Sequence, residues 1–155
     1  MDISQFMRPD LIFLDVRGQS KIDIFREIIE GMAKRHVIEH PKAFLEEIVQ
    51  REAQAPTCIG RGVALPHTRT IFVDKPIIAF ARTYRPISFG QQPEDSVEMI
   101  FLMGTPKEDP NTYLRILGNL CKLLRKKEIR ELLMRASTPG EILQIISETK
   151  QFQVY

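Results

Sequence analysis

The sequence predicts an α/β fold: a single domain with a mixed parallel and antiparallel sheet, flanked by helices on both faces. Short apolar runs of strand length alternate with longer segments of helical periodicity, which is the pattern of α/β domains. The length of 155 residues suits one compact domain, so we expect residues 1–155 to form it. Hydrophobic residues make up 43% and charged residues 27%, which is typical of a globular protein and not of a disordered chain.

The N-terminal segment predicts a strand followed by a helix. Residues 10–16 are a short apolar run of strand length. Ser20 and Asp23 have the spacing of a capping box, with Asp in place of the usual Glu, so a helix should begin here. Apolar residues then recur at helical spacing as far as Met32, which predicts a helix over residues 21–35.

A second helix is predicted from Pro41, because proline is favoured at the first helical position. It should end within residues 51–54, since Pro56 cannot continue a helix. Residues 55–70 mix glycine, proline and small residues, which predicts loops around one short strand at residues 63–65.

The middle of the chain predicts two further strands. Residues 76–82 are a strand candidate. Residues 97–103 form a nearly continuous apolar run, which is typical of a central strand. Between them, two prolines and a glycine within residues 85–96 predict a loop or an edge strand.

The last third of the chain predicts three helical segments. A long helix is expected over residues 112–125, and another segment is marked by apolar residues within 129–133. Thr138, followed by a proline and by Glu141, is a good N-cap, so a last helix should continue to Ser147. In the long helix one apolar stripe should face the core, and it consists of Leu114, Leu117, Cys121 and Leu124, widened by Leu120.

Charge and composition exclude several function classes. Lys and Arg number 22 against 20 Asp and Glu, so the net charge is +2 and bulk charge does not favour nucleic acid as a partner. The basic run at residues 125–127 is explained either by docking of an acidic partner or by a solvated helix face. No apolar stretch approaches the length of a membrane span, and no secretion signal is visible, so we expect a cytoplasmic protein. Cys58 and Cys121 form no metal-binding motif.

Three histidines are candidates for chemistry. His36 and His40 have the spacing of metal ligands on a helix, but they fall at a helix end just before Pro41. No nearby acid or cysteine completes a ligand set, so two surface histidines in a turn are the favoured interpretation. His67 follows Pro66 at the end of a short strand, where rigid structure can hold a side chain that still faces solvent.

The surroundings of His67 are suited to an anion. Gly60 and Gly62 lie just upstream, and Arg51 ends the preceding helix. A neutral imidazole beside cationic and backbone N–H donors suits a nucleophile that accepts a phosphoryl group. Two alternatives remain at this point: a histidine without chemical function in an ordinary loop, and a nucleophile formed by Cys58 with His67. For Cys58 itself, a small buried thiol is the favoured interpretation.

The segment from Arg51 to His67 reads REAQAPTCIGRGVALPH. It resembles the signature of enzyme IIA domains of the bacterial phosphoenolpyruvate-dependent phosphotransferase system, fructose–mannitol type. The similarity extends over nearly the whole chain. Residues 82–89 and the apolar helix at 114–125 resemble the nitrogen-regulatory branch of that family most closely.

The resemblance implies a fold, an activity and a set of partners. Members have a mixed sheet flanked by helices and use neither a metal nor an organic cofactor. Their histidine, matched here by His67, accepts a phosphoryl group on Nε2 from a histidine-containing phosphocarrier protein. It passes the group to a IIB domain, or its phosphorylation state regulates a kinase or transporter. Arg51 matches an arginine that lines the family site, so the resemblance implies a phosphotransferase with His67 and Arg51 as its catalytic residues.

Four further residues are expected to bind the phosphoryl group: Gly60, Gly62, Thr68 and Tyr113. The sequence also departs from the family pattern at three positions. Thr68 stands where the family often has glycine, Cys58 replaces another glycine, and Tyr113 occupies the place where many members carry a second histidine. We expect the Tyr113 hydroxyl to approach the His67 imidazole; in the alternative, its ring only covers apolar surface. The departures also keep open a non-catalytic regulatory module that docks partner proteins.

Overall fold

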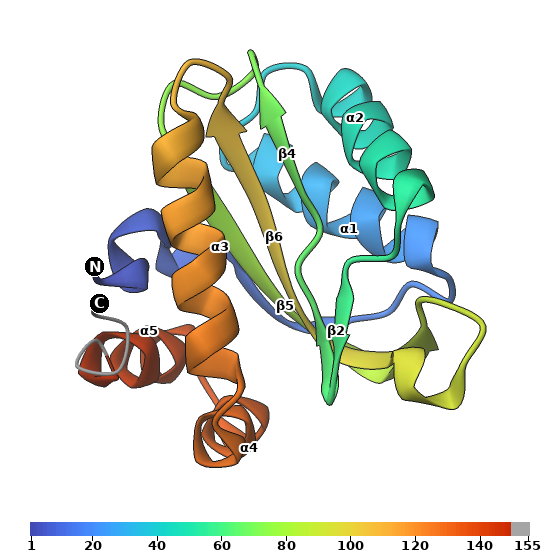
Figure 1. The fold of residues 1–155 in the computed structure, drawn as a ribbon, viewed down its shortest axis with the longest axis vertical. Helices are drawn as coiled ribbons and strands as arrows, with labels where there is room; N and C mark the ends of the chain where they lie inside the picture. The colour runs from blue at the N-terminus through green and yellow to red at the C-terminus, as the bar shows by residue number, and fades with distance from the viewer. Residues whose placement is uncertain (150–155) are drawn as a thin grey trace.

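The computed structural model describes residues 1–149 and consists of one mixed sheet with helices on both of its faces (Figure 1). The order across the sheet is β1, β5, β6, β3, β2, and β4 also pairs with β6. The strands are β1 (Ile12–Val16), β2 (Cys58–Gly60), β3 (Gly62–Ala64), β4 (His67–Thr70), β5 (Ile77–Ser88) and β6 (Ser96–Pro106). The pairs β5–β6 and β2–β3 are antiparallel, and the others are parallel. The predicted fold class is confirmed.

Strands β3 and β4 lie end to end along β6. Ala64 pairs with Ile100 and His67 pairs with Met103, so the register is the same before and after the gap between the two strands. The gap falls at Leu65 and Pro66, and a proline has no N–H to donate to a ladder. His67 is therefore the first residue of a strand whose position is fixed by the central strand of the sheet.

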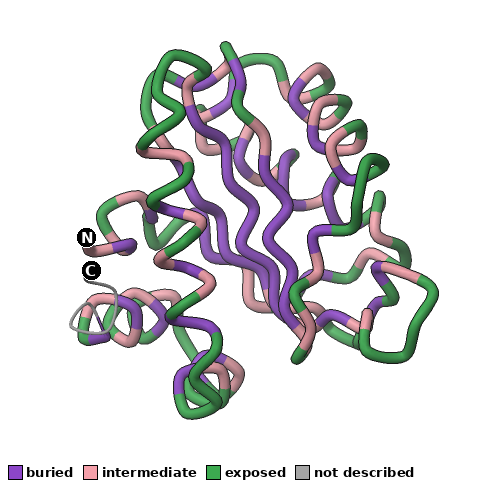
Figure 2. Tube along the Cα trace, in the orientation of Figure 1, coloured by how far each residue is buried: buried purple, intermediate pink, exposed green. Residues whose placement is uncertain are grey.

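Two hydrophobic cores lie on opposite faces of the sheet, with the buried strands between them (Figure 2). One face is covered by α1 (Lys21–Lys34) and α2 (Pro41–Gln54). The other is covered by α3 (Pro110–Leu124), α4 (Lys127–Arg135) and α5 (Pro139–Glu148), together with the 3-10 turns η1 (Ile3–Phe6) and η2 (Pro9–Leu11). A third 3-10 turn, η3 (Pro93–Asp95), precedes β6. Side chains of β6 alternate between the cores, because successive residues of a strand point to opposite faces.

The predicted helix starts are confirmed where capping determines them. The Ser20 hydroxyl accepts a hydrogen bond from the backbone N–H of Asp23, and the Thr138 hydroxyl accepts one from the N–H of Glu141. These bonds satisfy N–H groups that have no partner within the helix. The predicted helices at 21–35 and 41–54 agree with α1 and α2 to within a residue.

Three expectations are wrong. Residues 58–60 and 67–70 were predicted as loops but form strands β2 and β4. For residues 85–96 a loop or an edge strand was expected, and β5 continues into this segment as far as Ser88. Beyond Arg82, β5 carries a wide bulge: Arg82 lies opposite Met99 and Ile87 opposite Val97. The core stripe of α3 is also different from the predicted one. Leu114 is 62% exposed, and the helix buries Ile116, Leu120, Leu123 and Leu124.

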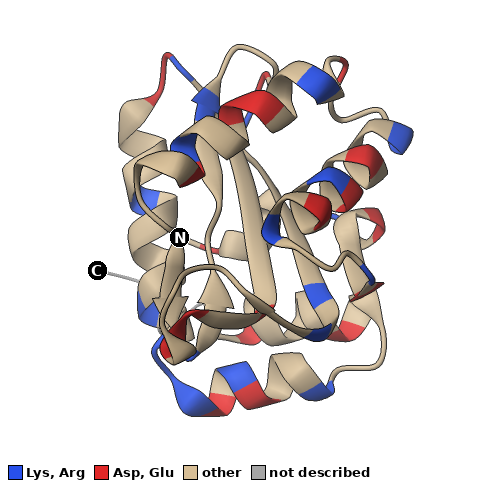
Figure 3. Cartoon of the chain, turned by 90° about the vertical axis from the view of Figure 1, so that its right-hand side faces the viewer, with Lys and Arg blue, Asp and Glu red and all other residues tan. Residues whose placement is uncertain are grey.

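Charged side chains of both signs lie mainly on the helices and near the strand ends (Figure 3). Within residues 1–149, no helix combines the length and the apolar character that crossing a membrane requires.

Candidate functional site

Strand β4 lies between α2 and α3 (Figure 1). His67 is its first residue, and the His67 ring contacts a residue of α3. The His67 side chain is mostly buried, with the residue only 8% exposed. The imidazole Nδ1 lies 2.6 Å from the backbone carbonyl oxygen of Leu65. Because a carbonyl oxygen can only accept, Nδ1 must carry the proton. The neutral ring therefore keeps a free lone pair on Nε2, the atom expected to react.

Burial is the largest influence on the pKa of His67 and lowers it below the ordinary value of 6.5. The hydrogen bond to the Leu65 carbonyl opposes this effect, the positive charge of Arg51 lowers the pKa further, and the negative charge of Glu52 raises it. The net shift is downward. At neutral pH the imidazole is therefore uncharged, the state that a nucleophile needs.

Arg51 lies in the last turn of α2, and its side chain is half-buried. Its Nη1 donates a hydrogen bond to the carbonyl oxygen of Ala55 at 3.0 Å, which ties the guanidinium to the end of the helix. A cation is favoured at this position, because the carbonyl end of a helix carries partial negative charge. The influence of Arg51 on His67 shows that its charge acts at the imidazole. Arg51 is thus near enough to His67 for an electrostatic interaction, and a joint catalytic role of the two residues stays a prediction.

Tyr113 packs against His67 from α3. The two ring centroids are 5.5 Å apart, and the rings are tilted by 57°. Tyr113 therefore forms one wall of the site, in agreement with the expectation that this residue lies beside His67. Contact between the hydroxyl and the imidazole, or a phosphoryl group on it, stays a prediction.

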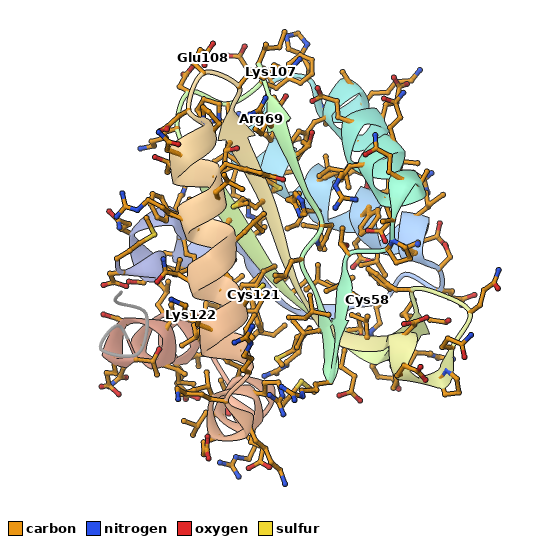
Figure 4. All side chains as sticks on the ribbon, viewed as in Figure 1. Cys58, Arg69, Lys107, Glu108, Cys121 and Lys122 are labelled. Carbon is orange, nitrogen blue, oxygen red and sulfur yellow. The ribbon has the colours of Figure 1, made fainter. Side chains whose placement is uncertain are left out.

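Thr68 directly follows His67 on β4 and is partly exposed. Its hydroxyl donates to the carbonyl oxygen of Arg69 at 3.2 Å. Arg69 lies further along β4, toward the loop that carries Lys107 and Glu108 (Figure 4). Thr68 is thus next to His67 in the chain, but its hydroxyl is directed to its own strand.

Gly60 and Gly62 are not brought to His67. Both have a φ of 83°, and Arg61 between them has a φ of 59°, so the three residues form the turn between β2 and β3. Gly62 pairs with Val97 of β6, whereas His67 pairs with Met103. Six residues of a strand span about 20 Å, so backbone N–H groups of this turn do not reach the imidazole. The glycines are explained instead by the left-handed conformation that the turn requires.

The structure does not place Cys58 beside His67. Cys58 is on β2 and pairs with Ala64 of β3. Its thiol lies 3.5 Å from a carboxylate oxygen of Asp95. Burial raises the pKa of this thiol, and the hydrogen bond to Asp95 raises it further, so it is protonated at neutral pH. Cys121 lies on α3, a different element, and burial raises its pKa too (Figure 4).

The two other histidines, His36 and His40, are exposed in the connection between α1 and α2, as the sequence predicted. Across residues 1–149, no group of three or more His, Cys, Asp or Glu side chains is arranged to hold a metal ion.

The sequence analysis missed Glu52, which is only 5% exposed on α2. Its carboxylate accepts hydrogen bonds from the backbone N–H of Thr57 at 2.9 Å and from the Thr57 hydroxyl at 2.5 Å. Lys21 of α1 forms an ion pair with it at 3.3 Å. One signal was available in the sequence, because Glu52 directly follows Arg51 within the segment that carries the resemblance.

Comparison with known proteins identifies the family. Residues 5–149 match the family described as phosphoenolpyruvate-dependent sugar phosphotransferase system, EIIA 2. The chain belongs to this family. The match includes the His67 segment, all the strands and all the helices of the described structure.

Relatives of the EIIA domain carry names from both branches of the family. The chain is 29% identical over 148 residues to the fructose-specific EIIABC component of Bacillus subtilis (strain 168), a match that covers 96% of this chain and 23% of that protein. It is 29% identical over 143 residues to a nitrogen regulatory protein of Bradyrhizobium diazoefficiens, with 92% of each chain covered. The chain thus spans about a quarter of the length of the EIIABC relative but nearly all of the nitrogen regulatory one.

Solved structures agree with the family assignment. The nitrogen regulatory protein IIA-Ntr from Neisseria meningitidis superimposes with a TM-score of 0.85 at 30% identity, covering 93% of this chain and 98% of that one. IIA mannitol from Escherichia coli has a TM-score of 0.76 at 21% identity and covers 88% of this chain and 96% of that one. At 21% identity, the similarity to IIA mannitol shows a shared fold and no more.

Proposed function

We propose that this EIIA domain is a phosphoryl carrier that accepts a phosphoryl group on Nε2 of His67. The observation that carries the proposal is the 2.6 Å contact between Nδ1 and the Leu65 carbonyl oxygen, since it leaves Nε2 as the free nucleophile. Family membership supplies the reaction class, transfer from a phosphorylated protein. The donor proposed is the histidine-containing phosphocarrier protein.

The transfer balances as an exchange between two imidazoles. The lone pair of Nε2 attacks phosphorus in line with the donor nitrogen, so the new N–P bond forms as the donor N–P bond breaks. The donor leaves as a neutral imidazole. The His67 ring gains positive charge as the bond forms and retains the proton on Nδ1. The Leu65 carbonyl then accepts a hydrogen bond from a more acidic N–H, an interaction that strengthens toward the transition state.

Arg51 is proposed to stabilise the transferring group. Its cationic guanidinium acts at the imidazole and suits the equatorial phosphoryl oxygens, where negative charge is spread. Tyr113 closes the other side with its ring. Since donor and product are both phosphohistidines, positioning and electrostatics are the main contributions that the protein must supply.

The recipient is proposed to be a IIB domain or a regulated protein. A solved complex in the same fold family contains IIA mannitol with phosphorylated IIB mannitol of Escherichia coli, which supports a IIB recipient. Similarity to nitrogen regulatory proteins over nearly their whole length supports a regulatory use of the same phosphorylated state.

A labelling experiment tests the proposal. The protein is mixed with enzyme I, the phosphocarrier protein and labelled phosphoenolpyruvate, and the expected label is acid-labile and base-stable. His67→Ala should take up none, whereas the matched variants His36→Ala and His40→Ala, both at exposed positions, should label normally. Phosphate located by mass spectrometry on His36 or His40 would refute the assignment. Absence of labelling on a folded wild-type protein would favour the docking module instead.

A further inference from the structure

Glu52 is a buried carboxylate that the transfer reaction does not use directly. Both of its oxygens are occupied by Thr57, one by the backbone N–H and one by the hydroxyl. Lys21 supplies the compensating positive charge and also donates to the carbonyl oxygen of Phe89 at 2.9 Å. A buried charge is costly unless it is paired and hydrogen-bonded. The Glu52 carboxylate therefore keeps Thr57 and Lys21 in fixed positions around it.

A continuous series of hydrogen bonds leads from Thr57 to the reactive ring. The carbonyl oxygen of Thr57 accepts a hydrogen bond from the N–H of Leu65 at 3.0 Å. The carbonyl oxygen of Pro66 accepts one from the N–H of Met103 at 2.9 Å. Leu65 is thus held on both sides, and its own carbonyl oxygen accepts from Nδ1 of His67. Its neighbour Pro66 cannot donate a competing backbone hydrogen bond.

We propose that Glu52 is a positioning residue for His67, acting through Thr57 and the Leu65 carbonyl to hold the imidazole as the tautomer that reacts at Nε2. This inference rests on the proposed function for its role in transfer. Its structural part, control of the tautomer, stands independently. The carboxylate fixes Thr57, Thr57 fixes the Leu65 backbone, and the Leu65 carbonyl selects the proton position on the ring.

A second threonine–glutamate pair provides a matched control. The Thr70 hydroxyl donates to a carboxylate oxygen of Glu47 at 2.6 Å, and this bond also joins α2 to the β4 region. Thr70 is buried like Thr57, with 1% and 6% of the residue exposed. The Thr70 side chain, however, is not part of the series that leads to the Leu65 carbonyl. The Thr57 hydroxyl bonds α2 to the segment that leads into β2, whereas the Thr70 hydroxyl bonds α2 to β4. Each substitution therefore removes one hydroxyl–carboxylate bond made by α2, but only the one at Thr57 affects the proposed route.

The experiment compares Thr57→Val, Thr57→Ser and Thr70→Val with the wild type. The His67 tautomer is read from its ¹⁵N chemical shifts at a pH where the ring is neutral, and phosphorylation is followed as a time course. Thr57→Val should raise the population protonated at Nε2 and slow phosphorylation at least about tenfold, since small displacements of a reacting group are costly. Thr57→Ser restores the hydroxyl and should return both readouts toward wild type. Thr70→Val should leave the tautomer unchanged and the rate within about twofold.

Glu52→Gln is the second variant in case Thr57→Val does not fold. The amide keeps the size of the side chain but can accept at only one of its two terminal atoms, so a partial shift of the tautomer is expected. A wild-type tautomer in both folded variants would overturn the inference. Equal effects of Thr57→Val and Thr70→Val would also overturn it, because they would indicate general loosening of α2. If the wild type takes up no phosphoryl group, the proposed function fails, while the tautomer measurement still decides the role of Glu52.

Discussion

Replacing Arg51 by alanine should slow phosphoryl transfer much more than it destabilises the fold. Removing one donor that stabilises a transition state typically costs about 2–4 kcal/mol. At about 1.4 kcal/mol for each factor of ten, this corresponds to a rate about 30- to 700-fold lower. The contribution to stability is smaller, because within residues 1–149 the half-buried guanidinium makes one hydrogen bond, to the Ala55 carbonyl, and such a bond contributes about 1 kcal/mol.

The assay must separate charge stabilisation from the protonation state of His67. The positive charge of Arg51 lowers the pKa of His67, so its removal raises that pKa. Transfer from the phosphorylated carrier protein should therefore be timed at a pH near 8, where the imidazole is neutral in both proteins. Arg51→Lys keeps a positive charge but lacks the planar pair of N–H donors, so its transfer rate should lie between those of the wild type and Arg51→Ala. Arg26→Ala is the control, since Arg26 is an exposed arginine of α1 that pairs only with Asp23 in the described structure.

Two results would refute this reasoning. One is a transfer rate for Arg51→Ala equal to that of the wild type at high pH, with normal folding. The other is an equal loss of rate in Arg26→Ala, which would indicate a general effect of surface charge on docking.

Four further outcomes are expected. Tyr113→Phe keeps the ring and should leave the unfolding free energy unchanged. Phosphoryl transfer should slow about two- to tenfold, which corresponds to the loss of one neutral hydrogen bond. An unchanged transfer rate would mean that the Tyr113 ring only covers apolar surface. The depressed pKa of His67 means that the unfolded chain binds a proton at a higher pH than the folded one, so stability should rise with pH over the interval from the folded pKa up to 6.5. Denaturant titrations should show a weaker rise in His67→Gln, and an identical rise would contradict the shift. Gly118→Ala should stabilise the protein by about 0.5–1 kcal/mol, because α3 has open space there. Gly31→Ala should destabilise it, because the added Cβ would lie 2.8 Å from the Phe13 ring, and a gain equal to that of Gly118→Ala would contradict the packing.

The features predicted best from the sequence are those set by local chemistry. Ser20 and Thr138 mark helix starts because a cap forms with residues only three positions away. The central strand β6 was predicted for a similar reason: it is buried on both faces, so its residues are apolar without alternation.

Of the two missed strands, β2 pairs with the next strand along the chain, β3, whereas β4 depends on a distant partner. β4 is a short segment of His, Thr and Arg with no apolar pattern of its own, and it forms because β6 offers a ladder more than thirty residues later in the chain. The register of α3 failed for another reason. Apolar residues cover more than half of its circumference, so the periodicity did not decide between a stripe through Leu114 and one through Ile116.

In the site too, residues within one sequence segment were predicted, whereas contacts between distant segments required the structure. His67 and Arg51 were predicted from one continuous segment, and the fold brings Tyr113 to His67 from a helix that begins beyond β6. The glycines in the same segment were assigned a chemical role, although the backbone of their turn already requires them. Glu52 was missed because a glutamate on a helix usually faces solvent, and only the tertiary structure shows what buries it.

The position of His67 explains how a mostly buried ring can still serve a partner protein. Among the described strands, β4 pairs only with β6, so no strand covers its other edge, and we propose that the donor phosphohistidine approaches there. Three groups act on the ring. The Leu65 carbonyl is within hydrogen-bond distance of Nδ1, and Tyr113 packs against the ring from the helix layer on one face of the sheet. From the helix layer on the other face, the positive charge of Arg51 lowers the pKa of the imidazole. Because these groups come from different elements, the edge of the sheet where both layers meet gives the imidazole a fixed orientation, which suits the proposed reaction at Nε2.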